Sequence, residues 1–354
     1  MRRKEKREEE QIELKQSKGI TLIALVVTII ILLILAGVTI YFVVNSGLIG
    51  KTEEAKTKSN QGTENDLDTM NLAEEEIAKY INGNNSTIEG LPEGLKGKIP
   101  EGFHYVEGSI EEGAVIEDAE GNQFVWIPVD GIKVKYERQD FGKQYGNYSE
   151  YSEVIDTEAQ NSVNTNGGFY IARFEAGNSS NTVRTSASDL ITDKVVSKKN
   201  NTVYNYVTRD QAKTLAESMY PGKSKLVSSY AWDAIMNFVA DDNHSIIDSS
   251  NWGNYYDSSV PANIEGYGVL QNTGYSEYWK AKNIYDLAGN SYEWTTEGYS
   301  DAGYPCVRRG GSYYFGGTPV SYRSSDTTSN SISSVSFRVV STECWKTRIE
   351  DSRK

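Results

Sequence analysis

A short segment near residue 290 carries residue types that could bind a metal ion. It reads NIYDLAGNSYEW (283–294), and it places Asp286, Gly289, Ser291 and Glu293 at short spacing. Carboxylate and backbone carbonyl oxygens on a bending loop are the ligands that Ca²⁺ prefers. The same residues also fit a tight turn, in which Asp286 accepts hydrogen bonds from backbone amides and Trp294 enters the core. Both interpretations stay open on the sequence alone.

Other common reactive groups are scarce. The only histidines are His104 and His244, and the only cysteines are Cys306 and Cys344. They show no zinc spacing, and the chain has no phosphate-binding loop. A hydrolytic triad would need one of the two histidines, and neither has a nucleophile elbow nearby. The cysteines either form a disulfide, which an oxidising compartment would permit, or are free thiols.

The N-terminal part predicts a membrane anchor. Residues 20–44 form an apolar run without any charge. As a helix this run would be roughly 37 Å long, enough to cross a bilayer. Seven Lys and Arg residues among the first 18 predict a cytoplasmic N-terminus and an outward-facing C-terminal domain. The net charge of −13 disfavours nucleic acid as a partner.

The junction KGITLIA (18–24) resembles the class III leader of type IV prepilins and pseudopilins. This resemblance implies cleavage between Gly19 and Ile20, and pilin-like subunits as partners. The family usually has a Glu, associated with subunit assembly, where this chain has Ala24. A plain signal anchor is the alternative.

Composition and periodicity divide the rest of the chain. A polar stalk and a Gly- and Pro-rich linker are expected over 45–98, a globular domain over 99–345 and a tail over 346–354. Strands are predicted at 124–129 and 168–176. Helices are predicted at 208–220, where Thr208 and Gln211 form a capping box, and at 228–240. The predicted class is therefore α+β, with two helices, short strands and long loops.

Several segments together resemble the formylglycine-generating enzyme (sulfatase-modifying factor) family. They span roughly 100–342 and read FVWIPVDG, GFYIARFEAG, YVTRDQAKTLAESM, KLVSSYAWD, LAGNSYEWT, RRGGSYY and SFRVV. The resemblance implies a C-type-lectin-like fold. It also implies a structural Ca²⁺ held by the Asp286 side chain, the Gly289 and Ser291 carbonyls, and Glu293.

The resemblance does not extend to the catalytic residues of the family. Its active oxidases hold copper on a cysteine pair between the Arg-Gly-Gly-Ser and Gly-Phe-Arg elements. Copper(I) requires soft thiolate ligands, and the interval from Ser312 to Phe337 contains no cysteine. We therefore expect a protein that is not an enzyme, with a copper-dependent oxidase as the least favoured reading.

Residues 310–336 have the composition of a binding surface. Ser, Tyr and Gly account for 16 of these 27 residues, a mixture that is typical of paratopes. The variable proteins of diversity-generating retroelements resemble this arrangement. The alternative is a set of Ser-rich loops that only connect strands. The predicted ligand-binding residues are Tyr313, Tyr314, Tyr322, Arg323, Asp326 and Asn330.

Three arginines in and near this segment have a second interpretation. Arg309, Arg323 and Arg338 are expected to hold loops through buried hydrogen bonds rather than to bind ligand. Taken together, the sequence predicts a single-pass cell-membrane protein, adhesin-like or receptor-like, whose extracellular domain binds a protein or glycan. A minor pseudopilin is the main alternative.

Overall fold

The computed structural model describes residues 90–261 and 264–341. These residues belong to the second of two compact units, which begins at Tyr80. The predicted leader with Gly19 and Ile20, the membrane helix 20–44, the stalk, the tail and Cys344 lie outside the described residues. Within the described ranges, no helix is long and apolar enough to cross a membrane.

The larger sheet has six strands in the order β1-β2-β3-β5-β15-β8, and all its pairings are antiparallel. Its strands are β1 (Phe103–Glu107), β2 (Val115–Asp118), β3 (Gln123–Pro128), β5 (Gly168–Ala172), β8 (Ser224–Leu226) and β15 (Val339–Ser341). The two strands predicted from sequence correspond to β3 and β5. The last strand of the described chain, β15, lies between β5 and β8 and pairs with both.

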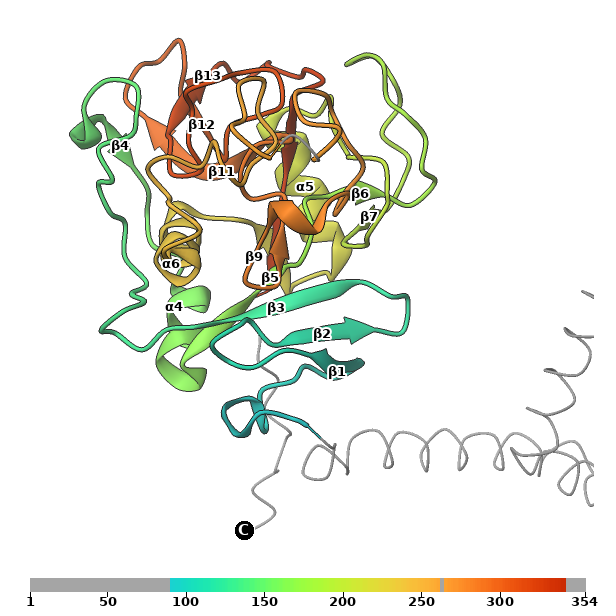
Figure 1. Cartoon of the computed structure of the whole chain (residues 1–354), viewed down its shortest axis with the longest axis vertical. Helices are drawn as coiled ribbons and strands as arrows, with labels where there is room; N and C mark the ends of the chain where they lie inside the picture. Colours follow the sequence, from blue (N-terminus) through green and yellow to red (C-terminus); the bar gives the residue numbers. More distant parts are fainter. Residues whose placement is uncertain (1–89, 262–263, 342–354) are drawn as a thin grey trace, which may run out of the picture. The chain divides into compact units, whose positions relative to one another are not determined.

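The second sheet is built on a hairpin of β11 (Tyr292–Tyr299) and β12 (Cys306–Arg309). It is completed by β4 (Tyr151–Ser152), β13 (Ser324–Asp326) and β14 (Val335–Phe337), which runs parallel to β11. Two short pairs join β6 (Gly177–Asn178) to β7 (Val195–Val196) and β9 (Lys280–Ala281) to β10 (Ile284–Tyr285). Figure 1 shows β1 to β3 at the lower end of the domain and β11 to β13 at the upper end.

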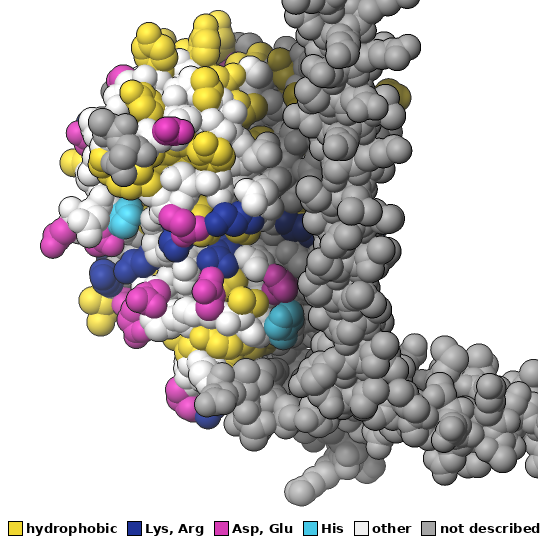
Figure 2. All heavy atoms as spheres, turned by 45° about the vertical axis from the view of Figure 1, so that its right-hand side comes forward, with side chains coloured by type: hydrophobic (Ala, Val, Ile, Leu, Met, Phe, Trp, Pro, Cys, Tyr) yellow, Lys and Arg dark blue, Asp and Glu magenta, His cyan; other side chains and the backbone are white. Residues whose placement is uncertain are grey.

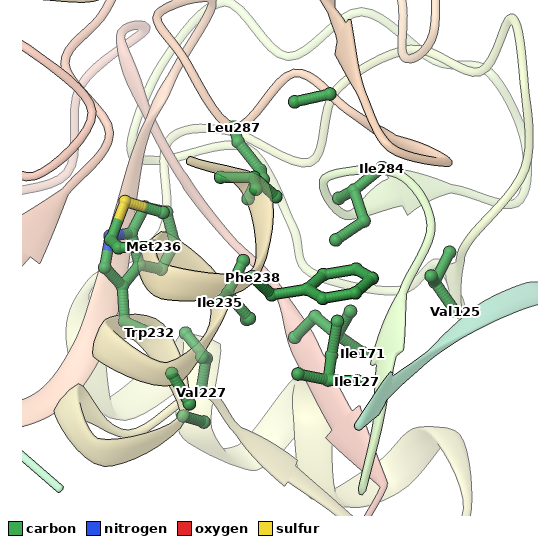
Figure 3. Packing of buried hydrophobic residues seen from close by; sticks show 14 of the residues in the cluster. Val125, Ile127, Ile171, Val227, Trp232, Ile235, Met236, Phe238, Ile284 and Leu287 are labelled. Carbon is green, nitrogen blue, oxygen red and sulfur yellow. The ribbon is translucent and has the colours of Figure 1, made fainter. Parts of the chain in front are cut away.

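The two predicted helices are present as α5 (Arg209–Met219) and α6 (Ser229–Val239). The capping box of α5 forms in both directions, because the Gln211 amide donates to the Thr208 hydroxyl and the Thr208 amide donates to Gln211 Oε1. Most of α6 is buried. Figure 3 shows its Phe238 ring pointing towards Ile127, Ile171 and Ile284, so this helix fills the space above the large sheet.

The prediction of two helices was wrong, because the described chain has a third, α4 (Thr157–Asn166). Its sequence, TEAQNSVNTN, lacks a continuous apolar stripe, since only Ala159, Ser162 and Val163 are buried. The helix begins where the Asp156 side chain accepts from two backbone amides. Capping and tertiary contacts therefore outweigh its weak helical pattern. Three short 3₁₀ turns also occur, at Glu93–Leu95, Tyr148–Glu150 and Glu277–Trp279.

The fold begins earlier than the Gly- and Pro-rich composition indicated. Leu95 is completely buried, although it lies in the predicted linker, and Ile99 joins the same core cluster. Leu95 thus anchors the end of a segment whose other residues are typical of a linker.

Candidate functional site

The segment 283–294 forms a buried turn that leads into β11. Asp286 adopts a left-handed backbone (φ 59°), and its Oδ2 accepts a 2.6 Å hydrogen bond from the Gly274 amide. Gly289 approaches the chain at Asn254 so closely that a Cβ would lie 2.1 Å from the Asn254 carbonyl oxygen. Trp294 is fully buried and donates to the Val207 carbonyl oxygen. The segment therefore is a turn that seats Trp294 in the core.

Glu293, the last of the four predicted calcium ligands, is engaged by Arg338. Arg338 Nε lies 3.0 Å from both carboxylate oxygens, and Nη2 lies 2.6 Å from Oε1. The other Arg338 hydrogen bonds go to the carbonyl oxygens of Ala172 and Tyr285. Both charged side chains are fully buried. The charge of Glu293 is therefore already compensated by protein.

Two other carboxylate oxygens in this region have no partner. Glu175, which follows β5, is fully buried, and its Oε1 accepts from the Asn290 side chain. Its Oε2 is buried without a hydrogen bond, and so are Asp286 Oδ1 and the Ser291 hydroxyl. Sequence reasoning missed Glu175 because it lies far upstream of the motif, with no spacing signal to connect the two.

Burial and mutual repulsion disfavour the charged forms of these acids. Burial is the main cause that raises the pKa of Asp286 to about 7. The pKa of Glu175 is raised well above its ordinary value, first by burial and then by the charges of Asp286 and Glu293. Burial also raises the pKa of Glu293, although Arg338 opposes this. Three buried acids face one arginine here, so the group is stabilised by protons or by a cation.

The free oxygens suit a hard cation such as Ca²⁺ better than a soft metal. Nowhere in the described chain do three or more His, Cys, Asp or Glu side chains gather to hold a metal. A cation at this turn would therefore need backbone carbonyls as well, as the resemblance implies for Gly289 and Ser291. Asp286 and Glu175 are the carboxylates with free oxygens, whereas Glu293 is already paired with Arg338.

Cys306, the only cysteine in the described residues, lies buried in β12, and no described residue forms a disulfide with it. Burial raises the pKa of this thiol, which disfavours the reactive thiolate. Its proposed disulfide partner, Cys344, lies outside the described residues.

The predicted ligand residues of 310–336 differ in how far their side chains are exposed. Tyr314 is 66% exposed, and Tyr313 and Tyr322 are half-buried. Asp326 and Asn330 are also half-buried, and they bind each other, while Asp326 also pairs with Arg308. Arg323 is fully buried and cannot line an exposed surface. For Arg323, the structure agrees with the second interpretation, that of a loop anchor.

Buried contacts of Arg309, just before the segment 310–336, and of Arg323, in its middle, hold this segment in place. Arg309 Nη2 lies 2.9 Å from Asp233 Oδ1, and Arg323 Nη2 lies 2.5 Å from Asp233 Oδ2. Arg323 Nε also binds both oxygens of Glu297, at 3.1 Å, and Arg138 Nε binds Oε1 of the same carboxylate at 3.1 Å. These contacts tie the start and the middle of the segment to α6 and β11.

Large apolar side chains are exposed on this anchored segment and on the loops next to it. We call them the aromatic platform, which comprises Tyr256, Tyr267, Val269, Tyr314 and Phe315. The loops are neighbours, because Gly268 lies against Tyr256 and Gly316 lies against Asp257. Tyr314 and Phe315 form an edge-to-face pair with ring centroids 5.3 Å apart. Figure 2 shows hydrophobic side chains gathered at the upper end of the domain.

A cavity of about 280 Å³ lies beside the platform, and we call it the Asp257 pocket. Its floor is held by buried hydrogen bonds, since the Tyr255 hydroxyl lies 2.6 Å from Ser249 Oγ and donates to the Gly310 carbonyl oxygen. The Val320 amide donates to the same Ser249 hydroxyl. The pocket is lined by Lys143, Ile247, Asp248, Ser249, Ser250, Tyr255, Asp257, Gly317, Thr318 and Pro319.

Three solved structures are similar to this chain at low sequence identity. The fold is similar to that of CarF and PvdO. CarF is 14% identical over 49% of this chain and 86% of its own, with a TM-score of 0.35. PvdO from Pseudomonas aeruginosa is 17% identical over 65% of this chain and 98% of its own, with a TM-score of 0.42.

A third similar structure is Treponema denticola variable protein 1, which is 12% identical over 68% of this chain and 99% of its own, with a TM-score of 0.27. No family model and no curated protein matches the sequence. Similarities at these levels concern the fold alone, and we carry no activity or ligand from these proteins to this chain.

Proposed function

We propose that this chain is a membrane-anchored, outward-facing ligand-binding protein, adhesin-like or receptor-like, whose domain performs no catalysis. The observation that carries the proposal is the aromatic platform beside the Asp257 pocket. Exposed Tyr and Phe side chains offer a large contact area and have few rotatable bonds to immobilise. Large apolar side chains that gather on adjacent loops are a common mark of an interaction site.

Rigidity beneath the platform supports the same proposal. Asp233 and Glu297 hold Arg309 and Arg323 in the interior, so the backbone on both sides of Tyr314 and Phe315 is fixed before any ligand arrives. A binding surface that is ordered in the free protein loses less conformational entropy on binding. The ligand is an extracellular protein or glycan that meets this upper end of the domain.

The absence of the copper-binding cysteine pair from the sequence supports a role without catalysis. Between Ser312 and Phe337 the chain offers hydroxyls in place of the thiolates that copper(I) requires. The apolar run 20–44 and its basic flank support the membrane anchor. The KGITLIA junction favours one other role, that of a minor pseudopilin, which would place the chain in a fibre rather than in the membrane alone.

The proposal is tested by displaying the full-length chain on cells and probing them with arrays of extracellular proteins and glycans. We expect a small set of ligands whose binding is lost in the double variant Tyr256→Ser, Tyr314→Ser. Recovery of the cleaved chain in sheared surface fibres, without any array binding, would favour the pseudopilin instead.

A further inference from the structure

The Asp257 pocket contains charged side chains that the protein does not pair. Within the described residues, neither the Asp257 carboxylate nor the Lys143 ammonium group has a hydrogen bond or an ion pair within contact distance. Asp248, which also lines the pocket, uses only Oδ1 to accept from Ser250. Hydrogen bonds from Ser250 lower the pKa of Asp248, and the nearby charge of Lys143 adds to this effect. The pocket thus offers two carboxylates and one ammonium group to a ligand.

The position of Asp257 depends on a glycine. A Cβ at Gly316 would lie 2.2 Å from Asp257 Oδ2 and 2.6 Å from Oδ1. The carboxylate therefore packs directly against the backbone of the 310–336 segment, where any side chain would displace it. Together with the hydrogen bonds of Tyr255 and Ser249 at the pocket, this contact places the exposed Asp257 carboxylate beside the cavity.

The open groups determine the chemistry of a matching ligand. The charged groups in the pocket are two carboxylates and one ammonium group, so a matching ligand donates at two positions and accepts at a third. Inorganic anions such as phosphate do not fit, because two carboxylates would repel them. The hydroxyl groups of a sugar ring meet the requirement, since each can donate to a carboxylate and accept from an ammonium group.

Size and surroundings agree with this chemistry. Pockets for drug-sized ligands measure roughly 300–1,000 Å³, and the Asp257 pocket, at about 280 Å³, suits a single ring. The exposed Tyr256 and Phe315 lie next in sequence to Asp257 and Gly316, where they can contact further parts of a longer ligand. Apolar aromatic faces complement the C–H faces of sugar rings.

We propose that the Asp257 pocket binds one sugar ring of a glycan, with Asp257 and Asp248 accepting from neighbouring hydroxyl groups and Lys143 donating to a third. This inference rests on the proposed ligand-binding function and names the class of ligand. The pocket binds the sugar ring, and the aromatic platform contacts the adjoining part of the glycan.

The test measures binding of the full-length chain to a glycan array and then to the methyl glycosides of glucose, galactose, mannose and N-acetylglucosamine. We expect at least one sugar to bind, and Asp257→Asn to weaken it about 10-fold or more, because a hydrogen bond to a charged group is lost. Gly316→Ala keeps every charge but displaces the carboxylate, and it should weaken binding similarly. Asp301→Asn, at the far turn of the β11–β12 hairpin, is the matched control and should bind as the wild type.

Melting curves establish that each variant is folded. Sugar binding that Asp257→Asn and Gly316→Ala leave unchanged would overturn the assignment. Binding of glucosamine without glucose would also overturn it, since the pocket would then be an ammonium site. Array binding to proteins alone would refute the sugar assignment and leave the proposed function standing, whereas no binding to either array would refute both.

Discussion

Glu293 and Arg338 form a fully buried ion pair that joins β11 to the residue before β15. Arg338 Nε lies 3.0 Å from each carboxylate oxygen, so the guanidinium group faces the carboxylate directly. The remaining donors of Arg338 reach the carbonyl oxygens of Ala172 in the large sheet and Tyr285 in β10. This pair therefore connects the two sheets at the turn that precedes Trp294.

Breaking the pair should destabilise the domain strongly. Arg338→Met leaves Glu293 buried without its partner, and we expect a loss of about 3–5 kcal/mol in the free energy of unfolding. The exposed pair Glu93–Lys96 provides the control, since Glu93→Gln should cost less than about 1 kcal/mol. Urea unfolding followed by tryptophan fluorescence measures both. Similar losses in the two variants would show that the buried pair has no special role.

Calcium should stabilise the folded domain if the free oxygens of Asp286 and Glu175 bind it. At about 100-fold excess over the dissociation constant, the gain is roughly 2.7 kcal/mol, and the melting temperature rises accordingly. Mg²⁺ should have a smaller effect because it loses its water ligands reluctantly. EDTA should reverse the gain, and Glu175→Gln with Asp286→Asn should abolish it. Identical melting curves with Ca²⁺ and with EDTA would mean that the turn binds no calcium.

Without divalent cations, stability should fall as the pH rises from about 4 to 7. The folded pKa of Asp286 is about 7, above its ordinary value, so the folded protein binds more protons than the unfolded chain in this range. An acid of this kind lowers stability with rising pH, by at most about 4 kcal/mol for this shift. Asp286→Asn cannot ionise and should flatten the dependence. Unfolding curves in EDTA at pH 4 to 7 measure the slope, and an equal slope in both proteins would exclude Asp286 as its source.

The proposed outward orientation of the domain predicts a specific protease fragment. Shaving of intact cells should release a domain whose N-terminus lies within residues 45–100, because the predicted stalk and linker are the accessible segment before the fold. Mass spectrometry of the released material identifies the end. Protection of residues 101–354 in intact cells, with cleavage after lysis, would contradict the predicted topology.

The strands and helices that sequence identified correctly have strong local signals. The Thr208–Gln211 capping box and the apolar face of α5 predicted that helix to within one residue at each end. By contrast, α4 has a polar sequence and depends on its Asp156 cap and on packing against β5, which no local pattern reveals. Leu95 was assigned to a linker for the same reason, since its burial depends on residues far away in sequence.

The candidate sites were predictable only in part. The motif at 283–294 identified the turn, but Glu175 comes from the end of β5 and meets the motif only in the folded chain. Likewise, the segment 310–336 indicated a binding surface, whereas the Asp257 pocket also needs Lys143 and the loop 247–257. The burial of Arg323 follows from Asp233 and Glu297, which sit on α6 and β11. Sites made from several distant loops leave no spacing signal in one sequence.

The affinity of the full-length chain for its strongest array ligand measures directly whether the aromatic platform is the binding surface. We expect Tyr256→Ser with Tyr314→Ser to weaken binding at least about 10-fold, since interface aromatics often contribute more than about 1 kcal/mol each. Tyr304, which is 51% exposed at the far turn of the β11–β12 hairpin, is the matched control, and Tyr304→Ser should leave the affinity unchanged. Equal affinities for the wild type and the double variant, both folded, would show that the aromatic platform does not bind the ligand.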